Sequence, residues 1–196
     1  MKQTLTLIPL ALLAACSSQS SPDAEPAADE TVSVTPATPM APEKTAPASP
    51  PAPSANTLSL AGLGDLRIGA AVPATSRWQE EGAQASETCR VLTSPAYPGS
   101  YAIAEGSKIR RISIGEGSPV KLAEGIGPGA SEADVKLHFP FPATPHKYAD
   151  APAKYLTAPD AASGQSALRI EIGSDGRVSQ IHVGTMPVLG YVEACS

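Results

Sequence analysis

Hydrophobic and polar residues divide the chain into three segments of different pattern. A continuous apolar run, Thr4 to Leu13, follows the positively charged Lys2. Between Ser17 and about Thr57 large apolar residues almost vanish, and Pro, Ala, Ser, Thr and acidic residues predominate. Periodic apolar positions then run from Leu58 to Ser196. The pattern predicts a globular domain, 58–196, behind a tether that buries too little apolar surface to fold.

Short stretches rich in β-branched residues predict antiparallel strands in the domain. The expected strands are residues 66–69, 89–93, 101–104, 108–114, 168–172 and 178–183. The turns Glu105-Gly106-Ser107 and Ser174-Asp175-Gly176 predict two hairpins, and Asp-Gly is a strong hairpin signal. His182 alternates with Ile181 and Val183, so we expect it on an exposed or half-exposed face.

Two capping patterns predict short helices. Ser76 with Gln79 fits a capping box and predicts a helix from about Thr75 to Ala85. Ser131, with Asp134 three residues later, predicts a second helix. Ala133 and Leu137 are its expected core positions, with Val135 a further candidate. Short helices on one face of an antiparallel sheet give an α+β fold.

The two predicted hairpins match each other at a fixed offset of 69 residues. Ile103 then aligns with Ile172, Ile112 with Ile181, and Ile114 with Val183. Ile-Gly pairs at 68–69 and 126–127 precede the two expected helices. We therefore expect two tandem repeats, 62–117 and 122–196.

The amino terminus matches a motif of exported proteins. The apolar run is too short to span a bilayer and ends at Leu13-Ala14-Ala15-Cys16. This resembles the lipobox of bacterial lipoproteins, and the resemblance implies a cleaved signal peptide, 1–15, and acylation of Cys16. Ser17 follows where the inner-membrane retention pattern has Asp. The expected location is the bacterial cell envelope, anchored in the outer membrane through the lipids on Cys16, with a Pro-rich tether over 16–57.

Cysteine number and charge narrow the possibilities further. Three cysteines occur, so acylation of Cys16 leaves Cys89 and Cys195 as a structural disulfide pair in an oxidising compartment. The spacing of the cysteines and histidines predicts no metal site, and nothing predicts a cofactor. The net charge of −5 argues against nucleic acid as a partner.

Few residues carry candidate chemistry. Lys108, Arg110 and Arg111 form the basic cluster of the domain. They are the expected contact for an acidic partner or for the anionic lipid or glycan of the envelope, although a charged edge strand explains them too. A Ser131, His146 and Asp150 triad is conceivable, but the chain lacks a nucleophile elbow.

Other polar and glycine-rich positions have ordinary explanations. The acidic pairs Glu80-Glu81 and Glu132 with Asp134 are expected to be solvated first-turn or exposed-face acids. The glycines at 125, 127 and 129 are expected to form a loop. We therefore predict no catalytic residues.

The order of Ile-Gly opening, capped helix and hairpins resembles the outer-membrane-assembly lipoproteins of the SmpA/OmlA type and the tandem-repeat β-lactamase-inhibitor proteins. Their openings usually read Gly-Met-Thr, where this chain has Gly69-Ala70-Ala71-Val72 and Gly129-Ala130-Ser131-Glu132. The resemblance implies a domain that binds other proteins.

Three functions follow from these patterns. The first is a non-enzymatic protein-binding lipoprotein, acting as an assembly accessory or an inhibitor. The second is a module that binds carbohydrate or peptidoglycan. Its sugar-stacking candidates are Trp78, Tyr97, Tyr101, Tyr148, Tyr155 and Tyr191. The third and weakest is a small hydrolase.

Overall fold

The computed structural model describes residues 55–82, 84 and 86–195. These residues belong to one compact unit, Ala48–Ser196. The predicted signal peptide, Cys16 and nearly all of the tether lie outside the described residues. Within the described part of the chain, no helix has the length and apolar character needed to cross a membrane.

An eight-stranded antiparallel sheet dominates the domain, with the strand order β3-β4-β5-β6-β10-β9-β8-β7. Its strands are β3 (Gln79–Glu80), β4 (Cys89–Thr93), β5 (Ser100–Glu105), β6 (Lys108–Ile114), β7 (Ala143–Pro145), β8 (Lys154–Thr157), β9 (Ala167–Ile172) and β10 (Val178–Gly184). A separate hairpin pairs β1 (Gly62–Leu63) with β2 (Leu66–Arg67). The predicted hairpins are confirmed as β5-β6 and β9-β10.

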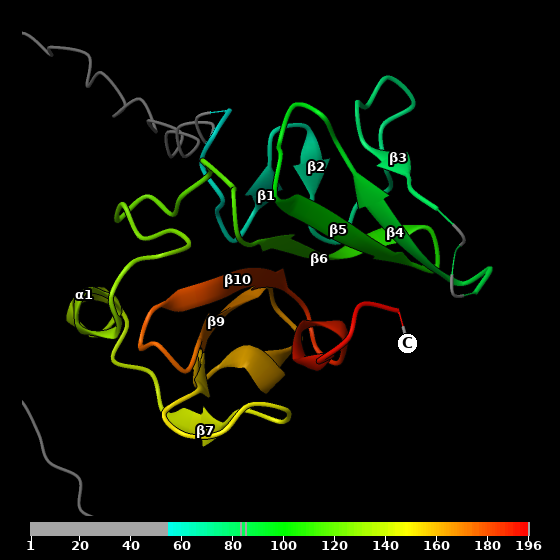
Figure 1. The fold of residues 1–196 in the computed structure, drawn as a ribbon. Helices are drawn as coiled ribbons and strands as arrows, with labels where there is room; N and C mark the ends of the chain where they lie inside the picture. Colours follow the sequence, from blue (N-terminus) through cyan, green and yellow to red (C-terminus); the bar gives the residue numbers. More distant parts are fainter. Residues whose placement is uncertain (1–54, 83, 85, 196) are drawn as a thin grey trace, which may run out of the picture. The chain divides into compact units, whose positions relative to one another are not determined.

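The strand order divides the sheet into two four-stranded meanders, β3 to β6 and β7 to β10. Their last strands, β6 and β10, pair with each other at the centre of the sheet (Figure 1). In this pairing Ser113 lies opposite His182, while Ile112 faces Val183 and Ile114 faces Ile181.

A β-bulge interrupts each hairpin at a corresponding place. The β5-β6 register shifts opposite Ile103 and Ala104, which leaves Arg110 unpaired. The β9-β10 register shifts between Val178 and Gln180. Because a bulge turns the residues beyond it to the other face, it decides which side chains of β6 and β10 enter the core.

One face of the sheet carries the main apolar core. Side chains alternate across a strand, so every second residue of the central strands points to this face. The aliphatic residues of that face are almost fully buried: Ile109, Ile112, Ile114, Ile170, Ile172, Ile181 and Val183. The β1-β2 hairpin adds Leu63 and Leu66 to the same core.

The predicted helices have different outcomes. The second is confirmed as α1 (Glu132–His138), and the side chain of its N-cap, Ser131, accepts a hydrogen bond from the backbone N–H of Asp134. Val135 is its buried residue, whereas Leu137 is 79% exposed, so the expected core role of Leu137 is wrong. Ala133 is exposed as well.

The first predicted helix is wrong. Turns and strand β3 occupy the described part of residues 75–85. The Ser76 hydroxyl accepts a hydrogen bond from the N–H of Trp78, which is a local turn and not a capping box. The described residues contain ten strands against α1 and two short 3-10 turns, so β-structure dominates the fold far more than an α+β layout implies.

The carboxy-terminal residues Thr185–Cys195, here named the strap, cross the second face of the sheet. They include the 3-10 turn η2 (Val188–Gly190), which contacts both β6 and β10. Val188 and Leu189 of this turn are buried. Because the strap covers that face, polar side chains of the central strands are buried there.

Candidate functional site

The covered face of the sheet holds a buried polar cluster. Its members are Arg111, Ser113, Arg169, Glu171 and His182, each at most 9% exposed. The Nδ1 atom of His182 lies 2.8 Å from the Ser113 hydroxyl, and its Nε2 atom lies 3.0 Å from Oε1 of Glu171. The prediction of an exposed or half-exposed His182 is therefore wrong, because the strap covers the face to which His182 points.

Burial and contacts shift both titratable groups of this pair. Desolvation lowers the pKa of His182 and outweighs the opposing effect of the Glu171 carboxylate. Burial by itself would raise the pKa of Glu171, but hydrogen bonding to His182 and the nearby His146 and Arg169 leave it below its ordinary value. A neutral His182 and an ionised Glu171 are thus the forms that the folded protein favours.

The cluster has the residue types of a serine hydrolase but not the access. Ser113 is completely buried in the middle of β6 and opposite β10, so no substrate carbonyl can approach its hydroxyl. The geometry instead satisfies the polar groups of three neighbouring strands. We interpret the cluster as structural.

The triad considered from the sequence is not assembled either. Ser131 donates its hydroxyl hydrogen to Asp134 and caps α1. The Nδ1 atom of His146 accepts hydrogen bonds from the N–H groups of Tyr148 and Ala149, and its Nε2 atom lies 3.6 Å from Glu171. The Ser131 hydroxyl and the His146 ring, which a catalytic triad would need, are therefore hydrogen-bonded to other groups.

The basic cluster does not form one surface. Arg111 is 1% exposed, and its guanidinium donates to the carbonyl groups of Val188 and Tyr191 and to the Tyr101 hydroxyl. Arg110 occupies the bulge and is half-buried, whereas Lys108 is exposed. Arg111 thus fastens the strap, which corrects its expected role as a surface contact; Lys108 and Arg110 remain candidates for such a contact.

A disulfide also fastens the strap. Cys89 at the start of β4 is joined to Cys195, and their Cα atoms are 5.7 Å apart. Sequence reasoning left the same two cysteines as a pair. The bond ties the end of the strap to the first meander, although the strap follows directly from the second.

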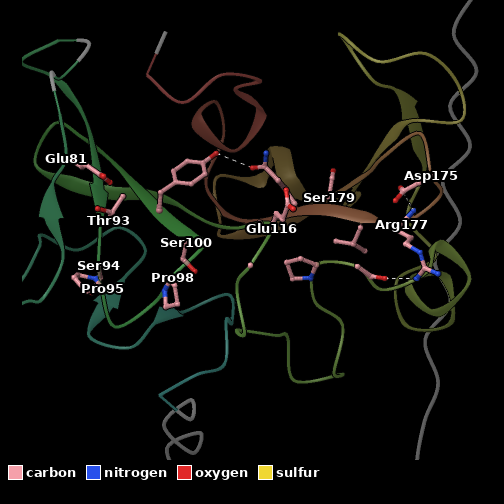
Figure 2. A pocket seen from close by; sticks show the side chains of 18 residues that line it. Glu81, Thr93, Ser94, Pro95, Pro98, Ser100, Glu116, Asp175, Arg177 and Ser179 are labelled. Carbon is pink, nitrogen blue, oxygen red and sulfur yellow. Dashed lines mark hydrogen bonds between the residues drawn. The ribbon is translucent and has the colours of Figure 1, made fainter.

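An open groove of about 1090 Å³ lies beside the strap, at the end of the sheet where β5 begins and β6 ends. Figure 2 shows Glu81 and Thr93 on one side, Asp175 and Arg177 on the other, and Glu116 and Ser179 between them. The rest of the lining is rich in proline, glycine and serine: Ser94, Pro95, Pro98, Gly99, Ser100, Gly115, Gly117, Pro128 and Gly129, with Tyr101, Val178 and Gln180.

The groove is acidic. Glu81, Glu116 and Asp175 face a single positive charge among the lining residues, that of Arg177. The Arg177 guanidinium donates to the carbonyl oxygen of Gly129, so it is partly engaged within the wall. A ligand that carries positive charge is therefore favoured here.

Tyr101 and Gln180 connect the groove to the covered face. The Tyr101 hydroxyl accepts a hydrogen bond from Arg111 and donates one, at 3.4 Å, to Oε1 of Gln180. These two residues are 79 positions apart in sequence. Sequence reasoning missed their pairing because no local pattern indicates that β5 and β10 begin at the same end of the sheet.

The remaining sequence candidates have structural explanations. Glu80 forms an exposed ion pair with Arg90, and Glu132 pairs with Lys136 and Lys154. The glycines around 125–129 form a loop, and the last of them lines the groove. Across the described part of the chain, no group of three His, Cys, Asp or Glu residues is arranged to hold a metal ion.

Compared with known proteins, the chain matches no family model, no curated protein and no solved structure.

Proposed function

We propose that this protein is a lipid-anchored binding protein of the bacterial envelope and that its domain holds a segment of a partner protein in the groove. The groove itself is the observation that carries the proposal. It is open, large enough for several residues of an extended chain, and lined by loops with little bulk. The assembly or inhibitor role implied by the sequence resemblance stays a prediction.

Binding is favoured over catalysis by the position of the reactive groups. The buried Ser113, His182 and Glu171 satisfy one another behind the strap. The groove presents carboxylates and a tyrosine, and its described lining contains no serine hydrogen-bonded to a histidine. These features suit recognition better than nucleophilic attack.

A carbohydrate ligand is the second candidate. Carboxylates beside an aromatic ring would suit sugar hydroxyl groups, and the groove has both. Tyr101 is, however, the sole aromatic side chain among the described lining residues, and the Arg111 guanidinium already lies 5.6 Å from its ring centre. Stacking of a sugar chain on two or more rings is therefore not supported, which favours a protein segment.

We also infer that the two meanders are tandem repeats. The offset of 69 residues places the bulged Arg110 on Ser179, and it places Ser113 on His182, which faces it across the centre of the sheet. A local two-fold axis through that pair would produce this register. In this arrangement Ile109 corresponds to Val178. Ala104 lies opposite Ile109 and Ile172 lies opposite Val178, so Ala104 is the counterpart of Ile172. The sequence alignment matches Ile172 with Ile103, one residue earlier.

The lipid anchor has a direct test. Replacement Cys16→Ser is expected to move the protein from the membrane fraction to the soluble fraction, because several acyl chains on one residue supply lasting attachment. Fractionation followed by immunoblotting measures the distribution. A variant that stays in the membrane fraction at unchanged amount would contradict the anchor.

The groove has a test in intact cells. A photo-crosslinking amino acid placed at Thr93 or Ser179, both in the groove wall, should capture one protein reproducibly. The same amino acid at the exposed Ala162, in the 3-10 turn η1 (Ala161–Ser163), is the control and should not capture it. Capture of glycan fragments alone would replace the proposal with carbohydrate binding, and equal capture from Ala162 would refute the groove as the site.

A further inference from the structure

The register of the two meanders defines counterparts of the groove residues Tyr101 and Gln180. Ala102 lies opposite Ile112, as Ile170 lies opposite Ile181. Under the proposed repeat, Ile112 corresponds to Ile181, so Ala102 corresponds to Ile170. Tyr101, which precedes Ala102, therefore corresponds to Arg169, which precedes Ile170. By the same alignment Gln180 corresponds to Arg111.

The counterpart of the groove is filled by the strap. After β10 the strap lies over these two arginines: Arg111 donates to the carbonyl groups of Val188 and Tyr191, and Arg169 donates to that of Gly190. Leu189 is fully buried there and packs with Ala158, Ala161 and Ala167. Arg111 of β6 and Arg169 of β9 thus already bind a polypeptide turn through its backbone carbonyls, and the second meander buries one aliphatic side chain of that turn.

The groove stays open because the chain takes another course after β6. Residues Gly115–Val120 follow β6 as the strap follows β10. Val120 is fully buried in the main apolar core, on the other face of the sheet. Among the described residues, no segment of the chain therefore lies over the groove as the strap lies over its counterpart.

Two features adapt the open position to an external segment. Gln180 accepts from Tyr101 through Oε1, and its Nε2 group has no hydrogen-bond acceptor among the described residues. Tyr101 and Gln180 are neutral where their counterparts, Arg169 and Arg111, are positively charged. Glu81 and Glu116 add negative charge to the groove. A segment with a lysine or arginine beside its turn is complementary to this charge.

We propose that the groove binds a turn of a partner protein in the manner of the strap: a backbone carbonyl accepts from Gln180, an aliphatic side chain enters the groove, and a basic residue lies near Glu116. The occupant is a polypeptide segment in an irregular conformation, not a helix. This inference rests on the proposed function and specifies the ligand of the same groove.

The test combines crosslinking from Ser179 with Gln180→Ala in the full-length, membrane-anchored protein. Loss of one hydrogen bond should lower the yield of the crosslinked protein about fivefold. Mass spectrometry should place the crosslink in a turn or loop of the partner within a few residues of a lysine or arginine. Gln165→Ala, an exposed position outside the groove lining, is the matched control and should leave the yield unchanged.

The outcomes separate this inference from the proposed function. A captured protein whose yield ignores Gln180→Ala, or whose crosslink lies in a regular helix, overturns the strap-like mode but leaves protein binding intact. Failure to capture any protein from Ser179 and Thr93 overturns both. A second variant, Glu116→Lys, should lower the yield through charge repulsion. An unchanged yield in this variant overturns the placement of a basic residue near Glu116.

Discussion

Under the proposed repeat, the groove corresponds to the place where the strap lies over Arg111 and Arg169, here named the strap site, but the two are built differently. In the strap site, two buried arginines hold carbonyl groups of the chain's own carboxy terminus, and Leu189 fills the space beneath. In the groove, Tyr101 and Gln180 stand at those positions and carboxylates surround them. The carbonyl groups of the strap fill one site, whereas no segment among the described residues covers the other.

The difference shows how one layout can serve stability or recognition. A buried arginine requires permanent hydrogen-bond acceptors, because an unpaired buried charge costs free energy. Neutral side chains with a weak internal hydrogen bond can exchange a ligand for water at small cost. The three predictions below test this contrast, beginning with the largest expected effect.

Removal of the disulfide should have the largest effect on stability. The double replacement Cys89→Ser and Cys195→Ser opens a loop with a sequence separation of 106, which the chain-entropy model values at about 5 kcal/mol of unfolding free energy. Denaturant unfolding measures the loss, and treatment of the native protein with a reductant should reproduce it. If stability does not change, the strap is held by its arginine contacts alone.

Replacement Arg111→Ala should lower the unfolding free energy by about 3 kcal/mol. It leaves the Tyr191 carbonyl and the Tyr101 hydroxyl without the Arg111 donor, and it removes one of the two donors to the Val188 carbonyl. Lys108→Ala, on the same strand but exposed, is the control and should change stability by less than about 0.5 kcal/mol. Equal losses in the two variants would contradict the role of Arg111 as the fastener of the strap.

Acidification should destabilise the domain more gradually. The folded state lowers the pKa of His182 through burial, so the unfolded state binds the proton first as the pH falls below the ordinary value of 6.5. The lowered pKa of Glu171 has the same sign and adds a loss as the pH falls below 4.5. The contribution of His182 to stability is therefore fully present above pH 6.5, and that of Glu171 above pH 4.5.

Denaturant unfolding at about pH 7.5 and about pH 5.5 tests the histidine contribution. The native protein should be less stable at the lower pH, and His182→Gln, which removes the titrating group, should reduce the difference. A native protein with equal stability at both values would show that His182 is not held in its neutral form.

Local signals in the sequence predicted local structure well. The Asp175-Gly176 turn, the alternation in 168–172 and the cap at Ser131 each depend on neighbouring residues, and each predicted element is present. The expected helix at 75–85 failed because Ser76 and Gln79 also suit a turn and a short edge strand. Pairing with β4 decided between these alternatives, and that pairing is not visible in the local sequence.

The candidate site depended on contacts between distant residues. The sequence predicted that Lys108, Arg110 and Arg111 form one basic cluster, but the bulge at Arg110 and the strap over Arg111 gave them three different environments. The prediction for His182 failed for the same reason. The predicted alternation of side chains along its strand was correct. The pattern of hydrophobic residues, however, does not show that the strap covers the second face.

By itself, the sequence determined the hairpins, the capped helix and the cysteines available for pairing. These features follow from backbone preferences and from hydrophobic content, which act over a few residues or through composition. The tertiary structure alone decided the joining of the meanders through β6 and β10, the burial of the polar cluster and the open groove. They depend on where the chain goes after each meander, because that course determines which face of the sheet is covered and which end stays accessible.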